Sequence, residues 1–213
     1  KKRHSTDSED HTIITEMLES SEHMAKIVKD LNQFSKASDD ERIYVDLVDV
    51  IETTLSFSQY QLLNSNIKIE KDYADDLPMI LGSKSQLQQV VLNIITNARD
   101  AMPSGGTLSI SAKHDERTQN AILKFSDTGE GIIEEHLARI FDPFFTTKPR
   151  GKGTWLCLSI SHGIIESHKG KLSVQSQQGV GTTFTITLST LTPDYLLKNE
   201  KYTPIPRKNL SRR

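Results

Sequence analysis

One amphipathic helix constrains the fold of this chain more than any other feature. From Ser85 to Gly106 the sequence reads SQLQQVVLNIITNARDAMPSGG, and its apolar residues recur at steps of three and four. This spacing predicts a helix that packs one apolar stripe on a core. Asn93 and Asn97 stand one turn apart at the edge of the stripe, so both amides can reach the same cleft. Alone, such a pair also fits two solvated amides.

Alternation of apolar and polar residues predicts the strands of one sheet. It occurs at residues 67–73, 107–113, 120–126, 171–176 and 183–188. Two more helices are expected, one at 158–168 and one that is capped by Asp46 and runs to about Leu63 after a short strand at 45–47. The helix after Asp46 should turn five residues inward: Val50, Ile51, Thr54, Leu55 and Phe57. The expected fold is therefore α/β, a two-layer α/β sandwich with a mostly antiparallel or mixed sheet.

The two ends of the chain differ from this central domain. From Thr12 to about Ser35 the apolar residues follow a narrow seam, which predicts a helix of a hairpin or two-chain bundle. We expect this helix to form a homodimer. Residues 191–213 carry three prolines and six Lys or Arg without apolar periodicity. This stretch is therefore interpreted as a basic, disordered tail.

The composition excludes several classes of protein. Of the 213 residues, 35% are hydrophobic and 25% charged, as in an ordinary soluble globular protein. The net charge of -2 argues against a nucleic-acid partner. A single cysteine, Cys157, excludes an internal disulfide and fits a reducing compartment. No segment reaches the roughly 18 apolar residues of a membrane span. We expect a cytoplasmic location without membrane contact in this stretch, although the intact protein can carry an anchor elsewhere.

A glycine-rich turn follows the strand at 120–126. It reads DTGEGI from Asp127 to Ile132. Two glycines two residues apart let the backbone approach a flat ligand, and an aspartate at the tip of a strand can accept a hydrogen bond from an exocyclic amine. This arrangement would suit adenine. By itself the same pattern is also an ordinary exit from a strand into a turn.

A second group of motifs lies further along the chain. Residues 140–148, IFDPFFTTK, predict a packed irregular loop because they are apolar but contain a proline. The cationic, glycine-rich PRGKGT at 149–154 precedes the helix at 158–168, and such a helix start is an anion site for phosphates. A glycine-hinged loop of this kind can also act as a lid. Thr182, in the turn before the last strand, could contact the base.

These motifs together, in order and spacing, resemble the ATP-binding catalytic domain of two-component sensor histidine kinases, within the GHKL ATPase/kinase superfamily. The likeness covers about residues 45–188. Residues 19–35, ESSEHMAKIVKDLNQFS, are similar to the second helix of that family's dimerisation and phosphotransfer hairpin. The resemblance implies three units: a partial dimerisation and phosphotransfer region at 1–42 with a helix at about 12–37, a catalytic domain at 43–190, and the tail at 191–213.

The resemblance also implies ATP and Mg²⁺ as ligands, with roles for individual residues. Asn97 would bind the Mg²⁺ that bridges the phosphates, and Asn93 would support it. Asp127 would bind the adenine amine. The base pocket would be completed by Gly129, Gly131 and Thr182.

The phosphate end of the site is implied in the same way. Lys148 would contact the terminal phosphate, and the lid would close through Gly151, Gly153 and Thr154. Many relatives carry a lysine three residues after the metal-binding asparagine, where this chain has an aspartate. Arg99, beside that position, is the candidate to supply the charge.

Two departures from the family pattern affect the prediction. The pattern continues G-L-G-L after GKGT, whereas this chain has Trp155 and Cys157 at the two glycine positions. If those glycines need positive φ or touch phosphate, each replacement costs on the order of 1 to 3 kcal/mol of ATP binding. In addition, no histidine stands where the phosphoacceptor is expected, so we place that histidine outside this stretch.

Three functions remain open at the level of the sequence. The first is a histidine kinase that passes the γ-phosphoryl group of ATP to a histidine and then to an aspartate of a response-regulator receiver domain. The second is a GHKL ATPase of the gyrase, mismatch-repair or chaperone type, but those enzymes use a glutamate where Asn93 stands. The third is a non-catalytic pseudokinase that dimerises and binds ATP poorly because of Trp155 and Cys157.

Overall fold

The computed structural model describes residues 42–143, 145 and 157–190. The elements in these ranges follow in the order β1 (Ile43–Val45), α2 (Leu47–Asn64), β2 (Ile67–Tyr73), β3 (Ile80–Gly82), α3 (Lys84–Ala101), β4 (Gly106–Asp115), β5 (Asn120–Asp127), α4 (Glu134–Leu137), α5 (Cys157–Ser167), β6 (Lys171–Gln177) and β7 (Gly181–Ser189). Five strands form one sheet in the order β2-β4-β5-β7-β6, and β1 pairs with β3 separately. Within the five-stranded sheet β2 runs parallel to β4 and the other neighbours are antiparallel. The sheet is thus mixed, as expected.

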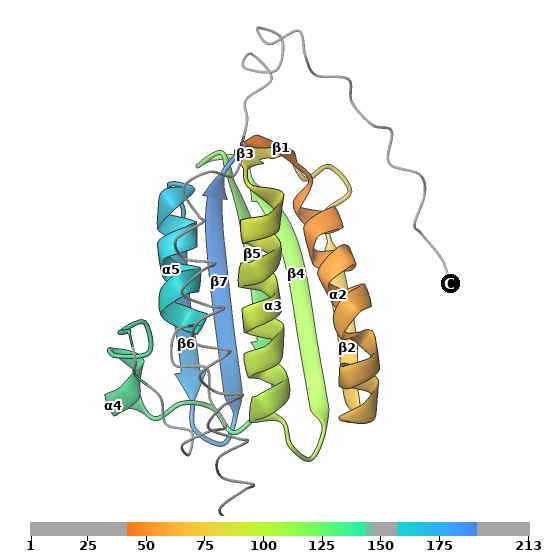
Figure 1. Cartoon of the computed structure of the whole chain (residues 1–213), viewed down its shortest axis with the longest axis vertical. Coiled ribbons are helices and arrows are strands. Elements are labelled where there is room, and N and C mark those ends of the chain that lie inside the picture. Colours follow the sequence, from red (N-terminus) through yellow and green to blue (C-terminus); the bar gives the residue numbers. More distant parts are fainter. Residues whose placement is uncertain (1–41, 144, 146–156, 191–213) are drawn as a thin grey trace, which may run out of the picture.

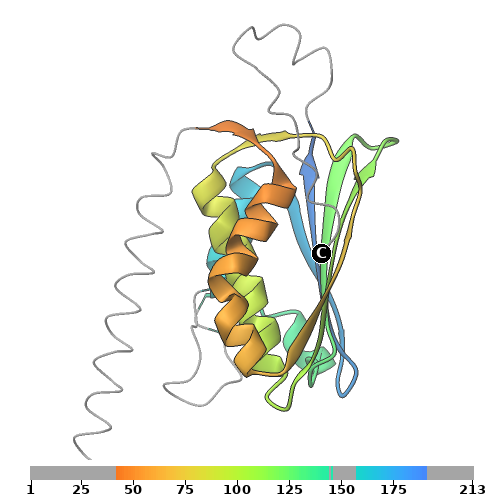
Figure 2. The ribbon, with the colours of Figure 1, turned by 90° about the vertical axis from the view of Figure 1, so that its right-hand side faces the viewer.

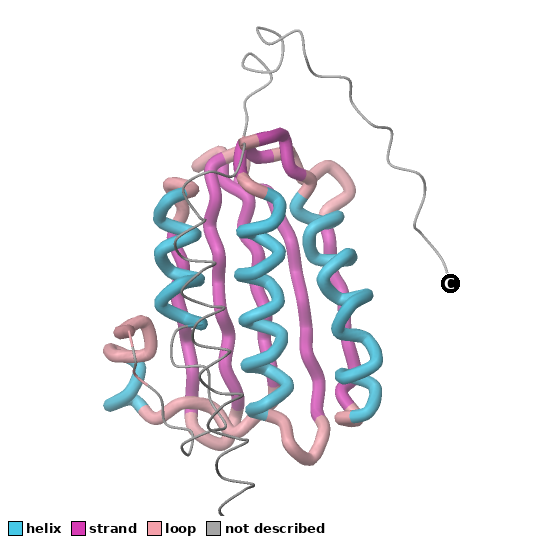
Figure 3. The backbone as a smooth tube through the Cα atoms, viewed as in Figure 1, coloured by secondary structure: helices cyan, strands magenta, loops and turns pink. Residues whose placement is uncertain are grey.

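Helices α2, α3 and α5 cover one face of this sheet. Figure 1 and Figure 3 show them side by side in front of the strands, and Figure 2 shows the two layers from the edge. The central helix, α3, contacts both α2 and α5. The predicted two-layer α/β sandwich is confirmed. No helix in the described ranges is long and apolar enough to cross a membrane.

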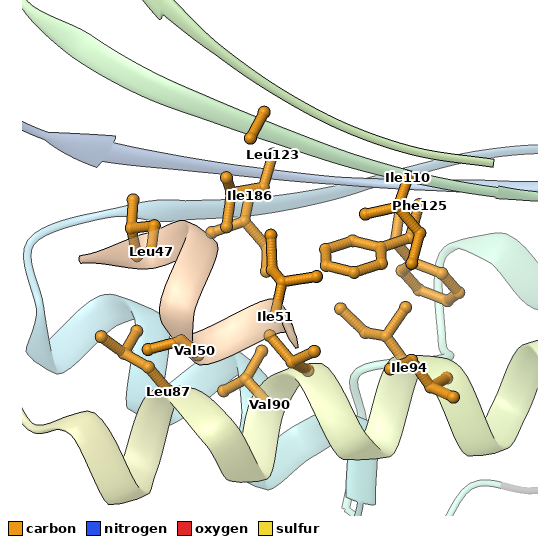
Figure 4. Close-up of a cluster of buried hydrophobic side chains, with 14 of the residues drawn as sticks. Leu47, Val50, Ile51, Leu87, Val90, Ile94, Ile110, Leu123, Phe125 and Ile186 are labelled. Atoms are coloured by element: carbon orange, nitrogen blue, oxygen red, sulfur yellow. The ribbon is translucent and has the colours of Figure 1, made fainter. Parts of the chain in front are cut away.

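The core lies between the two layers. Apolar residues of α2 and α3 point toward the inward residues of the sheet (Figure 4). Val90 and Ile94 of α3, one turn apart, are fully buried, as are Ile110 of β4 and Phe125 of β5. Burial of each such side chain contributes about 1.5 to 3 kcal/mol. The apolar stripe that the sequence predicts for α3 therefore packs the helix on the sheet. This packing also determines which side of α3 faces α5.

Helix α2 agrees with the sequence in its cap and differs in one side chain. Asp46 is the predicted N-cap, and its Oδ1 accepts hydrogen bonds from Val48 N at 2.8 Å and Asp49 N at 3.4 Å. The sequence predicts Phe57 on the inward face, and this is wrong because its side chain is 79% exposed. The buried residue next to it is Ser58, which lies 100° further around the helix. Phe57 thus falls outside the edge of the stripe.

The short strands also differ from the prediction. A strand was expected at residues 45–47, but β1 ends at Val45 because Asp46 caps a helix that begins at Leu47. Strand β3, which pairs with β1, carries no alternation long enough to be recognised in the sequence. The helix expected at 12–37 and the tail at 191–213 lie outside the described residues.

A buried histidine joins the end of α5 to the start of α3. Ser83, the N-cap of α3, donates its backbone N–H to Nε2 of His168 at 3.0 Å. The other ring nitrogen, Nδ1, lies 2.8 Å from the carbonyl oxygen of Ile164 and must donate to it. This pairing defines a neutral imidazole. Burial is the main cause that lowers the pKa of His168 below its ordinary value of 6.5.

Candidate functional site

Asp127 ends β5 and faces the inner side of the sheet. Its side chain is buried, and its register partner on β7 is Thr182. Oδ1 accepts hydrogen bonds from the backbone N–H groups of Gly129, at 2.9 Å, and Thr182, at 3.2 Å. Desolvation by burial raises the pKa of this carboxyl above its ordinary value, and the backbone hydrogen bonds to it only partly oppose the shift. Because both bonds use Oδ1, Oδ2 is the oxygen that can face a ligand.

The loop after Asp127 is fixed on two sides by its glycines. A Cβ at Gly129 would lie 2.5 Å from the carbonyl oxygen of Ala101, at the end of α3. Gly131 has a φ of 68°, and a Cβ there would clash with the carbonyl oxygen of Gln177. Only glycine allows these approaches. The close approaches seen are therefore to protein backbone, while the predicted contact of both glycines with a base stays a prediction.

Asn93 ties α3 to the first turn of α5. Its Nδ2 donates to the carbonyl oxygen of Cys157 at 3.1 Å and to Oγ of Ser161 at 3.0 Å. Ser161 is completely buried and donates in turn to the same carbonyl at 2.6 Å. Ser161 is not among the predicted site residues, although its spacing of four residues from Cys157 on a helix was a usable signal. Asn93 thus holds the start of the helix that follows the predicted lid.

Asn97, one turn further along α3, differs from Asn93 in its hydrogen bonding. Its Nδ2 is buried and has no hydrogen-bond partner among the described residues. A buried amide left in this way costs about 1 to 3 kcal/mol. An amide also offers a carbonyl oxygen, which is a ligand that Mg²⁺ accepts. The unpaired atom, Nδ2, is a hydrogen-bond donor that an acceptor such as a phosphate oxygen would satisfy, whereas the amide oxygen of the partly buried Asn97 is the atom that could hold Mg²⁺.

Asn97 and Asp127 belong to one region of the molecule. Glu130, in the loop after Asp127, donates its backbone N–H to the carbonyl oxygen of Ala101 at 3.0 Å. Ala101 lies one helical turn after Asn97, about 6 Å along the axis of α3, so the loop meets the helix one turn from Asn97. The structure thus brings the end of the asparagine helix against the DTGEGI turn.

Arg99 does not join this group. Its guanidinium donates to Oδ1 of Asp100 at 2.7 Å and to Oε1 of Gln61, on α2, at 2.8 Å. Two residues along a helix correspond to a rotation of about 200°, so Arg99 lies on the side of α3 away from Asn97. Its predicted catalytic role gains no support from this placement. The remaining predicted site residues lie outside the described residues: Lys148, Gly151, Gly153 and Thr154.

The aromatic segment before the predicted lid is packed, as far as it is described. Phe141 stacks at a tilt on His162 of α5, with ring centroids 5.0 Å apart. The guanidinium of Arg139 lies 4.6 Å above the ring of Phe145, and His136 of α4 meets the same ring edge-on. Cation and ring contacts of this kind stabilise by about 0.5 to 1 kcal/mol each when exposed. They anchor the chain where the predicted lid begins.

Comparisons with known proteins agree with this geometry. The family model described as histidine kinase-, DNA gyrase B-, and HSP90-like ATPase matches residues 82–192. The chain is 38% identical to sporulation kinase E of Bacillus subtilis over 65% of this chain and 18% of that protein. It is 32% identical to the sensor histidine kinase ZraS of Escherichia coli over 84% of this chain and 38% of that protein.

Solved structures of histidine kinases also resemble this chain. The catalytic domain of the histidine kinase ThkA superposes with a TM-score of 0.64 and 26% identity, covering 70% of this chain and 96% of that domain. The chain spans only about a fifth to two fifths of the length of the two curated relatives. The family model, in contrast, covers more than half of this chain and includes α3, the DTGEGI turn and β7. The chain therefore belongs to the family of histidine kinase-, DNA gyrase B- and HSP90-like ATPases.

Proposed function

We propose that this chain is the ATP-binding catalytic region of a sensor histidine kinase. It would transfer the γ-phosphoryl group of Mg-ATP to a histidine outside this stretch, for relay to an aspartate of a response regulator. The observation that carries the proposal is the pair of incompletely used polar groups in one region, the Oδ2 of Asp127 and the amide of Asn97. Asp127 is a buried residue and the Nδ2 of Asn97 is a buried atom, so a ligand that bonds to them would satisfy groups that the described part of the fold does not.

Asp127 supports the adenine end of the proposed site. An ionised carboxylate only accepts hydrogen bonds, and Oδ1 already accepts two from the backbone. The exocyclic amine of adenine carries two N–H donors, so it matches the remaining oxygen. Pairing this amine with a desolvated carboxylate is a charge-assisted hydrogen bond, which contributes about 1.5 to 3 kcal/mol.

Asn97 supports the phosphate end. The described residues contain no cluster of three His, Cys, Asp or Glu that could hold a metal by itself. Mg²⁺ commonly binds through few protein groups together with substrate phosphates, because it retains several waters. Asn97 fits such a site as a single protein ligand. The metal would supply charge neutralisation between phosphates, while Lys148 and the loop of Gly151, Gly153 and Thr154 would contact the phosphates.

Asn93 favours phosphoryl transfer to a protein over rapid hydrolysis. In the GHKL ATPases a glutamate at this place activates water. The amide of Asn93 cannot accept a proton at neutral pH, and its N–H₂ group is bonded to Cys157 and Ser161. Its role in the proposal is to position the start of α5, with catalysis left to orientation and charge neutralisation.

Cys157 does not by itself favour the non-catalytic alternative. Asn93 and Ser161 both bond to its backbone carbonyl, which a glycine would offer equally. The replacement of glycine by cysteine therefore preserves this junction. Trp155 lies outside the described residues, so its effect on the phosphate loop stays a prediction.

The partners in the proposal follow from the relatives. The alignment with ZraS extends over 180 residues, which is longer than the range 43–190 and therefore includes sequence beyond the catalytic domain. This supports an N-terminal helix that forms a homodimer, with the phosphoacceptor histidine outside this stretch and a receiver domain of a response regulator as the further partner. We place this region in the cytoplasm, where Mg-ATP and such a receiver domain are found.

A titration tests the proposed function. A fluorescent ATP analogue is added to the chain and to its Trp155→Gly, Cys157→Gly double variant, with and without Mg²⁺. We expect binding that depends on Mg²⁺ and is tighter in the double variant. Absence of binding by both proteins would remove the kinase proposal.

A further inference from the structure

Ser176 lies next to the proposed base site and has three hydrogen-bond contacts. It is on the inward face of β6, one residue before the end of that strand. Its Oγ accepts from the backbone N–H of Ile132 at 2.8 Å and donates to the carbonyl oxygen of Gly181 at 3.0 Å. The third contact is with Oγ1 of Thr182, at 2.8 Å. This serine is not among the site residues predicted from the sequence.

Only one placement of protons satisfies all three contacts. A serine hydroxyl has one proton and two acceptor sites. The carbonyl oxygen of Gly181 cannot donate, so it takes the proton of Ser176, and the N–H of Ile132 occupies one acceptor site. Thr182 must then donate its own hydroxyl proton to Ser176. Thr182 is left with acceptor sites alone.

Thr182 and Asp127 face the same buried region. They are register partners on β7 and β5, both side chains point to the inner face of the sheet, and Thr182 N lies 3.2 Å from Oδ1 of Asp127. The ionised Asp127 is also an acceptor only. With the proton of Thr182 directed to Ser176, the side chains of this pair present acceptors and no donor.

We propose that Ser176 is a positioning residue that selects a 6-amino purine over a 6-oxo purine by committing the hydroxyl proton of Thr182. This inference rests on the proposed function and deepens it. Adenine places an amine with two N–H donors at C6, and these match two acceptors. Hypoxanthine places an oxygen at C6, which would meet the oxygens of Asp127 and Thr182 without a proton between them, because its N1–H lies at the neighbouring ring position. Such unpaired buried acceptors are disfavoured.

The surrounding backbone keeps this arrangement in place. The N–H of Gly179 donates to the carbonyl oxygen of Glu130 at 2.8 Å, which joins the β6–β7 turn to the DTGEGI loop. A Cβ at Gly181 would clash with the carbonyl oxygen of Asp127, so the two strands approach closely there. Ser176 thus acts between two backbone segments that are already fixed, so its substitution should change proton placement more than loop position.

The test compares Mg-ATP with Mg-ITP, whose base is hypoxanthine, in competition titrations against a fluorescent ATP analogue. If the native chain binds too weakly, the Trp155→Gly, Cys157→Gly double variant serves as the common background. Ser176→Ala frees the Thr182 proton to donate to an oxygen at C6. We expect the ratio of ATP to ITP affinity to fall by about tenfold, the effect of roughly one hydrogen bond. Ser176→Thr should restore the ratio.

A matched control uses the same strand. Ser173 is also on β6, three residues earlier on the outward face, where its hydroxyl bonds to the carbonyl oxygen of Thr185. Ser173→Ala should leave the ratio unchanged. In a Thr182→Val background, Ser176→Ala should no longer change the ratio, because the hydroxyl through which Ser176 acts is absent.

The outcomes separate this inference from the proposed function. Equal losses of ATP and ITP affinity in Ser176→Ala would make Ser176 merely structural and overturn the inference, while ATP binding itself would stand. If Ser176→Ala fails to fold, Thr182→Val decides, because it removes the acceptor and should lower the same ratio; an unchanged ratio then refutes the inference. Absence of nucleotide binding by the native chain and the double variant would overturn both proposals.

Discussion

Replacing Asp127 by asparagine should weaken nucleotide binding without lowering the stability of this domain. The amide of Asp127→Asn would retain an Oδ1 that accepts from Gly129 N and Thr182 N, so the loop keeps its two anchoring bonds. The pKa of Asp127 is raised in the folded state above the ordinary 3.8. The folded state therefore binds a proton more tightly than the unfolded chain, and this contribution to stability is lost as pH rises through the folded pKa. At pH 7 the variant should be at least as stable as the native chain.

The expected effect on binding is of opposite sign. The substitution puts an N–H₂ group where Oδ2 was, and this donor would face the donor amine of adenine. Loss of a charge-assisted hydrogen bond of about 1.5 to 3 kcal/mol weakens Mg-ATP binding by roughly 10- to 150-fold. Repulsion between the two donors adds to that loss.

Two measurements check this prediction. Thermal unfolding is followed at pH 7 and at lower pH values, and the gain in the unfolding midpoint of Asp127→Asn should shrink as the pH falls, because the carboxyl of the native chain then becomes protonated. Nucleotide affinity is measured by titration with Mg-ATP. Asp72→Asn is the matched control, since Asp72 is exposed and paired with Lys113 on the same sheet. Undiminished ATP affinity in Asp127→Asn, with a normal fold, would refute the assignment of Asp127 to the base.

Three further changes have defined outcomes. Asn97→Ala removes a buried Nδ2 that has no partner in the described part of the chain, so the free energy of unfolding in urea should stay unchanged or rise, by up to about 1 to 3 kcal/mol, while Mg²⁺-dependent nucleotide binding is lost. Persistence of that dependence contradicts the metal role. Burial lowers the pKa of His168, so its contribution to stability is complete above pH 6.5 and decreases below it. The urea midpoint of unfolding should therefore fall between pH 7.5 and 5.5. In His168→Gln the midpoint should depend less on pH. Trp155→Gly with Cys157→Gly should tighten Mg-ATP binding by about tenfold or more in the same titration, and equal affinities would contradict the phosphate-loop interpretation.

The main elements of the fold could be predicted because their signals are local. The apolar period of α3 and the alternation in β4, β5 and β7 each identify an element and its buried face. Asp46 as an N-cap is equally local, because the carboxylate bonds to N–H groups two and three residues ahead. The error at Phe57 has the opposite origin: burial at the edge of a helical stripe depends on the neighbouring helix, which the sequence of α2 does not contain.

The types of residue in the site could be predicted from the sequence, but most of the contacts that they make could not. Gly129 and Gly131 signal close approaches, but their sequence does not say whether the neighbour is a ligand or the protein, and here it is Ala101 and Gln177. Arg99 could have been placed better from helix geometry alone, since about 200° of rotation separates it from Asn97. Ser176 could have been noticed as a polar residue at an inward position of an alternating strand.

The pattern of used and unused atoms is what connects this fold to a ligand. The protein itself occupies Oδ1 of Asp127, the N–H₂ of Asn93 and the hydroxyl proton of Thr182. These bonds hold the site rigid without engaging a substrate. The atoms left over are Oδ2 of Asp127, on a carboxylate whose ionised form burial disfavours, and Nδ2 of Asn97, a buried donor without a partner among the described residues; both lower the stability of the domain by itself. A ligand that pairs with both binds only the folded state and stabilises it by mass action. The same groups that weaken the empty fold therefore strengthen the complex, which is the expected signature of residues retained for binding.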